Sequence, residues 1–187
     1  MRLAYKAFNA DLTCTHGKGT FQYEPNKWYE EPQANCVKNG FHCAENPLDT
    51  MNYYGSWDDH QFWIVAIDGD IDEDGTDTKI SATKIKLVRQ LTLQEFLVHA
   101  VTYIYEHPSL PMNQRVKEDN TEMSENDKFV IVRNQDPWAK AVKIGQYIAL
   151  IKDSPKGSNT IEAAGLFKVD GITTRTNVWI DVEGKEC

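Results

Sequence analysis

The residues best suited to metal chemistry form an acidic run at positions 68–79, with the sequence DGDIDEDGTDTK. Its alternating aspartates and following glycine match the D-x-D-x-D-G core of calcium-binding loops, in which carboxylates converge on a hard cation. The second half of that pattern, an apolar residue and a bidentate glutamate, is missing. The run therefore predicts either a solvated acidic hairpin or a weak calcium or magnesium site. The ligands of such a site would be Asp70, Asp72, Asp74 and Asp77.

A second group of residues is suited to binding an anion. The turn Gly40-Phe41-His42 comes shortly before Asn46-Pro47, a pair typical of a helix cap and first helical turn. An imidazole beside the unpaired N–H groups of a helix start would form a site for a phosphate or a nucleotide, on which aromatic rings could stack. The alternative is structural, with Phe41 in the core, His42 bonded to local backbone and the tyrosines packed. The candidate binding residues of this segment are Phe41, His42, Asn46, Tyr53, Tyr54 and Trp57.

Cysteines are too few for a disulfide framework, and a chain of 187 residues can bury a core without one. We therefore expect free, buried thiols in a reducing compartment. A zinc site is the alternative, although paired C-x(2–4)-C ligands are missing. The residues concerned are Cys14, His16, Cys36, His42, Cys43 and, for the free thiols, also Cys187.

The element that most clearly positions these residues is a helix predicted over 92–107. Thr92 and Glu95 form a capping box at its start, apolar residues follow at helical spacing, and Pro108 ends it. Aromatic and β-branched runs predict strands before this helix, and a short helix is expected over 46–54. The predicted strands are 3–8, 19–23, 61–67 and 83–89.

Residues 1–108 are therefore expected to form an α+β domain, a mixed sheet with one long and one short helix. Residues 109–127 are mostly polar and predict a linker. Residues 128–187 contain short extended runs with turn residues between them, which predicts a small β-barrel or β-sandwich module.

The composition of the chain disfavours several classes of function. Acidic residues outnumber basic residues 28 to 20, giving a net charge of −8, which disfavours binding to a nucleic-acid backbone. The longest apolar run, at 62–67, is far shorter than the ~20 residues of a membrane-spanning helix. The amino terminus lacks the apolar segment of a secretory signal. We therefore expect no membrane association and a cytoplasmic location.

Several motifs occur in order along the first 108 residues. They are Tyr5-Lys6-Ala7-Phe8-Asn9, Gly40-Phe41-His42, Glu45-Asn46-Pro47-Leu48-Asp49, Tyr53-Tyr54 and Gly69-Asp70-Ile71-Asp72. Together they resemble an uncharacterised domain family of tailed bacteriophages and prophages. The chain departs from the family's Gly-Phe-His-Ala-Cys pattern, because Cys43 directly follows His42. The resemblance implies a phage accessory protein of the host cytoplasm, and it adds Lys6 and Phe8 to the candidate binding residues.

This resemblance favours a non-enzymatic binding protein that counteracts host defence. Its partner would be a defence protein, inhibited in the manner of an anti-CRISPR protein, or a nucleotide signal that it sequesters. The oligomeric state is open, with a homodimer among the candidates. One alternative is an ADP-ribosyltransferase-like enzyme using NAD, suggested by Lys6 and Gly40-Phe41-His42, although no activating glutamate is evident. A virion accessory module is the other.

Overall fold

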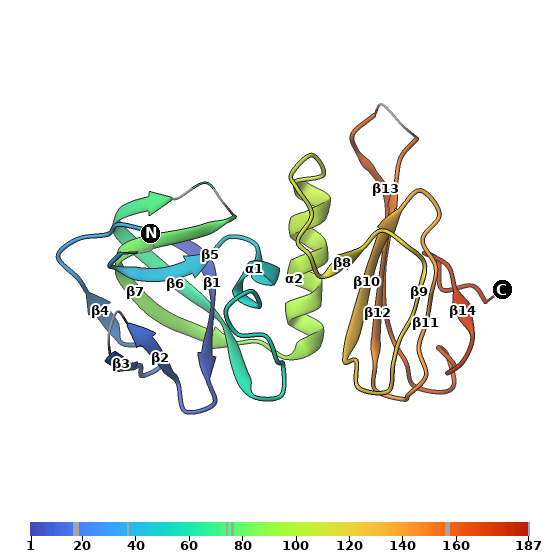
Figure 1. Cartoon of the computed structure of the whole chain (residues 1–187), viewed down its shortest axis with the longest axis horizontal. Helices are drawn as coiled ribbons and strands as arrows, with labels where there is room; N and C mark the ends of the chain where they lie inside the picture. The colour runs from blue at the N-terminus through green and yellow to red at the C-terminus, as the bar shows by residue number, and fades with distance from the viewer. Residues whose placement is uncertain (17–18, 37, 74, 76, 156–157, 187) are drawn as a thin grey trace. The chain divides into compact units, whose positions relative to one another are not determined.

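The computed structural model describes residues 1–16, 19–36, 38–73, 75, 77–155 and 158–186. These residues form fourteen β-strands and two α-helices, so the predicted α+β class is confirmed (Figure 1). The chain divides into two compact units, Met1–Phe96 and Leu97–Cys187. Each unit is described by itself.

The first unit is built on a five-stranded antiparallel sheet with the order β4-β7-β5-β1-β6. Because β6 also pairs with β7, the sheet curls back on itself, and it closes between β1 and β5 through the pair Tyr5–Ala44. A separate hairpin joins β2 (Thr13–His16) to β3 (Gly19–Gln22). The sheet strands are β1 (Arg2–Asn9), β4 (Trp28–Glu30), β5 (Phe41–Ala44), β6 (His60–Glu73) and β7 (Lys79–Gln90).

The long hairpin of β6 and β7 bends at Gly69. The pairing register shifts between Asp68 and Ile71, and Gly69 has a φ of +77°. A Cβ atom at Gly69 would lie 2.1 Å from the Thr83 hydroxyl oxygen, so both the conformation and the space require glycine. The bulge turns the far half of the hairpin toward β5. In that half, β7 pairs with β6 on one side and with β5 on the other.

The interior of this sheet is rich in aromatic and β-branched side chains. Edge-to-face contacts join Tyr23 to Phe8, Phe21 and Phe41, with ring centroids 4.7 to 6.2 Å apart. Ile80, Ala82, Ile85 and Leu87 of β7 are buried in the same cluster. The predicted strands at 3–8, 19–23, 61–67 and 83–89 correspond to β1, β3, β6 and β7, with β6 and β7 longer than expected.

Both predicted helices are present. The first, α1 (Pro47–Thr50), is a single turn, shorter than the predicted 46–54. The second, α2 (Leu93–Glu106), begins with the predicted capping box. Thr92 N donates to Glu95 Oε2 at 2.9 Å, and Glu95 N donates to Thr92 Oγ1 at 3.3 Å.

The second unit contains two small sheets. Their orders are β13-β12-β10-β8 and β14-β11-β9. Val132 and Leu150 of the first sheet share a buried cluster with Ala139 and Ile180 of the second, which gives the sandwich-like core that was expected. The strands are β8 (Val116–Lys117), β9 (Thr121–Glu122), β10 (Phe129–Asn134), β11 (Ala139–Lys140), β12 (Tyr147–Asp153), β13 (Ile161–Lys168) and β14 (Trp179–Ile180).

The segment 109–127 differs from the polar linker that was predicted. It contributes β8, which pairs with β10, and β9, which pairs with β11. Val116 and Met123 of this segment are 7% and 3% exposed. Strands of two residues create no visible period in the sequence, so each is recognisable only through the partner that it pairs with. The segment is therefore an integral part of the second unit.

Neither of the helices in the described part of the chain has the length and apolar character needed to cross a bilayer.

Candidate functional site

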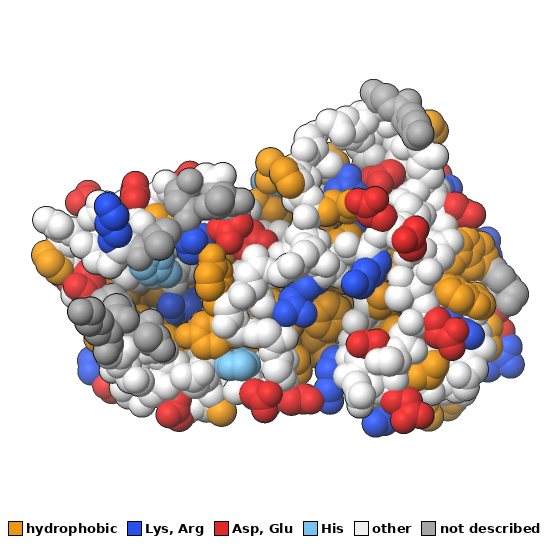
Figure 2. Space-filling model, in the orientation of Figure 1, with side chains coloured by type: hydrophobic (Ala, Val, Ile, Leu, Met, Phe, Trp, Pro, Cys, Tyr) orange, Lys and Arg blue, Asp and Glu red, His pale blue; other side chains and the backbone are white. Residues whose placement is uncertain are grey.

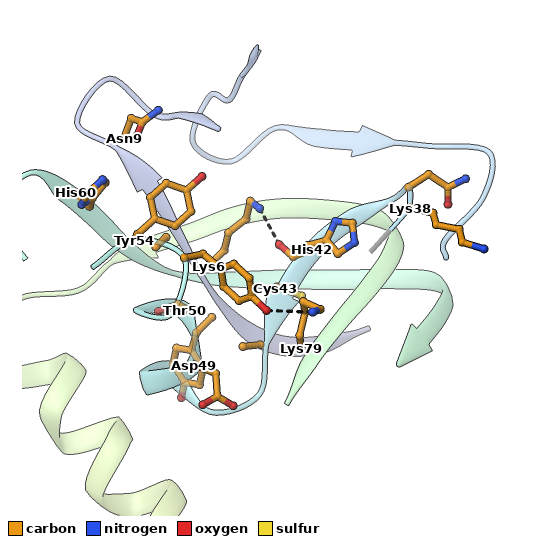
Figure 3. Close-up of a pocket in the computed structure, with 15 residues that line it drawn as sticks. Lys6, Asn9, Lys38, His42, Cys43, Asp49, Thr50, Tyr54, His60 and Lys79 are labelled. Carbon is orange, nitrogen blue, oxygen red and sulfur yellow. Dashed lines mark hydrogen bonds between the residues drawn. The ribbon is translucent and has the colours of Figure 1, made fainter. Parts of the chain in front are cut away.

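A cavity of about 650 Å³ opens on the first unit. Its volume falls within the ~300–1,000 Å³ of typical small-molecule sites. Figure 2 shows this part of the surface hollowed, with lysine, histidine and apolar side chains inside. Strands β1, β5, β6 and β7, helix α1 and the segments beside them supply the lining (Figure 3). The lining residues are Tyr5, Lys6, Ala7, Asn9, Lys38, Asn39, His42, Cys43, Ala44, Asp49, Thr50, Tyr53, Tyr54, His60 and Lys79.

Lys6 is the most unusual residue of the cavity. It lies on β1 between Ala4 and Phe8, which are both buried core residues, and its own exposed fraction is only 8%. Its Nζ donates to the carbonyl oxygen of His42 at 2.7 Å and lies 5.5 and 5.8 Å from the ring centroids of Phe8 and Tyr23. A buried charge is costly unless it is paired.

The Lys6 ammonium retains hydrogen-bonding capacity. An ammonium has three N–H donors, and within the described residues this one makes a single hydrogen bond. Lys6 is therefore a fixed, buried cation at the cavity wall that can donate to a bound acceptor.

Strand β5 brings His42 and Cys43 to the cavity. Gly40, with a φ of +84°, directly precedes the strand, and a Cβ atom there would lie 2.4 Å from the Ser81 hydroxyl oxygen. His42 pairs with Ser81 of β7 and accepts the hydrogen bond from Lys6. Burial raises the pKa of the Cys43 thiol to about 12, so the thiol stays protonated near neutral pH and is a poor nucleophile.

Two tyrosines after α1 form another part of the wall. Tyr54 is half-buried, and burial raises its pKa to about 12. Its ring meets the His60 ring edge-on with centroids 5.1 Å apart. Tyr53 is exposed, and its hydroxyl accepts from Lys79 Nζ at 3.0 Å and donates to Asp77 at 3.2 Å. Lys79 also lies 5.3 Å from the Tyr53 ring centroid, which fixes that ring at the cavity mouth.

Charge inside the cavity is opposite to that of the chain as a whole. Lys6, Lys38 and Lys79 supply three cations, whereas Asp49 is the one carboxylate among the lining residues of the described structure. The Asp49 carboxylate accepts from the Thr78 backbone N–H at 3.0 Å and from the Thr78 hydroxyl at 2.7 Å. In a chain of net charge −8, this concentration of lysines is suited to an anionic ligand.

The structure brings together four of the residues proposed from the sequence: Lys6, His42, Tyr53 and Tyr54 all line the cavity. The other four lie elsewhere. Phe8 and Phe41 are buried in the core, and Trp57 stacks on Phe62 with centroids 4.7 Å apart.

Asn46 is a structural cap and does not line the cavity. Its side-chain oxygen accepts from Leu48 N at 3.0 Å, so the expected anion site at this helix start is already capped. The helix that follows is a single turn.

Other lining residues were not found from the sequence. Lys79 lies in the acidic run and reaches the cavity because it pairs with Ala44 across β5 and β7. Asn9 and His60 pair with each other at the end of the β1–β6 ladder. Asn9 ends the motif Tyr5-Lys6-Ala7-Phe8-Asn9 but was not among the proposed binding residues, and His60 lies in no motif. Strand pairing between distant segments is the signal that would have found them. The remaining additions are Tyr5, Ala7, Lys38, Asn39, Cys43, Ala44, Asp49 and Thr50.

The acidic run forms the end of the β6–β7 hairpin. Asp72 accepts from Cys36 N at 2.7 Å, and Asp77 accepts from Lys79 N at 2.8 Å. Asp74 lies outside the described residues, and the described ones contain no group of three ligating side chains placed to hold a metal ion. Asp70 and Asp72 lie on a strand, where the geometry differs from that of a calcium-binding loop.

The predicted thiol state has a structural counterpart. Within the described residues, Cys14, Cys36 and Cys43 are buried and form no disulfide. Cys187 and the side chain of His16 lie outside the described residues. The zinc alternative therefore gains no support from the thiols that are described.

Comparison with known proteins places the first unit in a family. No curated protein and no solved structure shows significant similarity to the chain. A family model, described as a domain of unknown function (DUF7666), matches residues 2–99, just over half of the 187 residues. The match includes every residue that lines the cavity. The chain therefore belongs to the DUF7666 family.

Proposed function

We propose that the first unit captures a small phosphate-bearing ligand of the nucleotide class and holds it without chemical change. The observation that carries the proposal is the buried Lys6 ammonium, which faces the cavity with donor capacity to spare. Lys38 and Lys79 add positive charge, and the tyrosines add aromatic surface. Phosphates are bound through such charge-assisted hydrogen bonds, and bases stack on aromatic rings.

Binding is favoured over the ADP-ribosyltransferase alternative. The lining residues that the structure describes include no glutamate to activate an acceptor, and Asp49 is engaged by Thr78. The protonated Cys43 thiol is unsuited to nucleophilic attack. The alternative is tested by incubating the protein with NAD and cell extract, where release of nicotinamide would support it.

The biological setting that we propose is counter-defence by a phage protein in the host cytoplasm, where capture would deplete a nucleotide signal. A second candidate is inhibition of a defence protein through an acidic surface. It is supported by the exposed end of β6, where Asp68, Asp70, Asp72 and Glu73 are all exposed. A pull-down from infected cells distinguishes a protein partner from a small ligand, and mass spectrometry of purified particles tests a virion role.

The binding proposal is tested by titration calorimetry with inorganic phosphate, AMP, NAD and a cyclic dinucleotide. We expect at least one phosphate ligand to bind, and Lys6→Met to weaken it about tenfold or more, because a charge-assisted hydrogen bond contributes about 1.5–3 kcal/mol. Lys86→Met is the matched control. Lys86 lies on β7 outside the cavity, over the Trp28 ring, so this variant should bind normally. If no ligand binds, or if both variants behave alike, the proposal is wrong.

A further inference from the structure

We infer that the ligand is a linear nucleotide whose base carries an exocyclic amino group, bound with its phosphate on the lysine side of the cavity and its base beside Tyr54. This inference rests on the proposed function and adds the orientation of the bound ligand and its chemical class. It follows from the way in which charge and hydrogen-bond acceptors are divided between two sides of the cavity.

One side of the cavity is cationic. Figure 3 shows Lys38, His42 and Lys79 on one side, with the Lys6 ammonium directed toward His42. All four residues line the cavity. A phosphate group carries its negative charge on oxygens that only accept hydrogen bonds, so this is the side that it would occupy.

The other side is neutral and presents acceptors. Asn9, Tyr54 and His60 lie together there in Figure 3. The Nδ1 atom of His60 lies 2.9 Å from the carbonyl oxygen of Ser56. A carbonyl can only accept, so Nδ1 carries the proton, and in the neutral ring Nε2 is left as an acceptor.

The orientation of the Asn9 amide follows from its neighbours. The Thr13 hydroxyl donates its proton to Asp11 Oδ1 at 2.6 Å, so Thr13 Oγ1 must act as an acceptor toward Asn9. Asn9 Nδ2 donates to that oxygen at 3.0 Å. The amide oxygen of Asn9 is therefore its acceptor toward other groups.

These assignments give a side lined by two acceptors and an aromatic ring. A base edge that donates N–H groups fits such a side, and an exocyclic amino group is the donor that distinguishes adenine from hypoxanthine and cytosine from uracil. Tyr54 provides the aromatic face, whereas Tyr53 is held by Lys79 and Asp77. A cyclic dinucleotide carries bases at both ends, so it does not match a cavity with one cationic and one neutral side.

The test is calorimetry on the full chain with AMP, IMP, CMP, UMP, inorganic phosphate and cyclic di-AMP. We expect AMP and CMP to bind about tenfold more tightly than IMP and UMP. The amino group of AMP or CMP can donate to the acceptors of Asn9 and His60, so that neither is left unpaired in the complex. Asn9→Ala and His60→Phe should bring AMP down to the affinity of IMP while leaving the affinity for phosphate unchanged. Thermal melting confirms that each variant is folded, and the second variant serves if the first unfolds.

The possible outcomes distinguish failure of this inference from failure of the proposed function. If AMP and IMP bind equally well, or if cyclic di-AMP binds more tightly than AMP, this inference is wrong while the proposed function stands. The inference is equally wrong if the Asn9 and His60 variants keep the preference for AMP. If no phosphate compound binds at all, the proposed function itself is wrong.

Discussion

The side chain of Tyr23 is buried in the interior of the first unit together with its polar hydroxyl group. It is 1% exposed, and its hydroxyl is one of the buried polar groups for which the described structure contains no hydrogen-bond partner. Burial raises its pKa far above the ordinary value, and the nearby Cys14 thiol adds to the effect. The hydroxyl is thus neutral and unsatisfied, a state that costs stability.

Replacing Tyr23 by phenylalanine should therefore stabilise the protein. We expect Tyr23→Phe to raise the free energy of unfolding by about 1 kcal/mol, because an unsatisfied buried group is removed while the ring contacts stay. The measurement is urea unfolding. Tyr29→Phe is the matched control, since the Tyr29 hydroxyl accepts from Glu24 N at 2.8 Å, and its loss should lower stability. A destabilised Tyr23→Phe variant would show that its hydroxyl has a partner after all.

The sequence predicted some of the individual residues of the site and misplaced others. Tyr53 and Tyr54 were found through their position at the end of a predicted helix, and Lys6 through a family motif. Phe8 and Phe41 were misplaced because an aromatic side chain on a strand looks the same whether it faces a ligand or the core. Only the pairing of strands decides which face is buried.

Among the elements, α2 has the most informative start. Thr92 N donates to Glu95, as does the Thr92 hydroxyl, and Arg89 forms an ion pair with the same carboxylate. These contacts, with the Thr92 backbone bond as the largest cause, lower the pKa of Glu95 from 4.5 to about 2. A lowered carboxylate pKa means that the ionised form stabilises the folded state.

This capping box should make stability pH-dependent in a defined window. The contribution of Glu95 is fully present above about pH 4.5 and is lost as the pH falls toward about 2, because the carboxylate becomes protonated. Melting temperatures of the native protein and of Glu95→Gln should therefore differ most near neutral pH and converge in acid. Equal separation of the two curves at every pH would contradict the pKa assignment.

The acidic hairpin yields a prediction about metal ions. Asp72 and Asp77 already accept hydrogen bonds from the backbone of Cys36 and Lys79. We therefore expect about 1 mM calcium, or its removal by chelator, to change the melting temperature by less than about 1 °C, since only a ligand that binds the folded state stabilises it. A larger rise that disappears in Asp70→Asn would establish a metal site instead.

Element prediction succeeded where the local signal was strong. The capping box and Pro108 defined α2, and runs with aromatic or β-branched residues defined β1, β6 and β7. It failed for β8 and β9, because two residues in a polar context carry no periodicity. Strand β5 was also missed, since Phe41–Ala44 is short and is held in place by β7 and β1.

At the scale of the whole molecule, all the features of the candidate site belong to the first unit. The lining residues run from Tyr5 to Lys79, and Phe96 packs on Phe62 with ring centroids 5.0 Å apart. The family match covers the same region. The second unit has its own buried cluster and its own sheets.

A fragment of residues 1–108 should therefore fold and retain binding. We expect one cooperative thermal transition and an affinity for AMP within about threefold of the full chain, because the fragment keeps α2 and the whole cavity. Circular dichroism and calorimetry provide the two measurements. A folded fragment that binds nothing, beside a full chain that does bind, would assign part of the site to residues 109–187.

The double pairing of β5 has a kinetic consequence. Backbone hydrogen bonds attach this strand to β7 along its length and to β1 at Ala44, and Lys6 is tied to His42 across the same wall. Such a wall cannot swing open without breaking the sheet, so entry should need only side-chain adjustment. Stopped-flow mixing should then give a single exponential whose rate increases linearly with ligand concentration and decreases as salt screens the lysines.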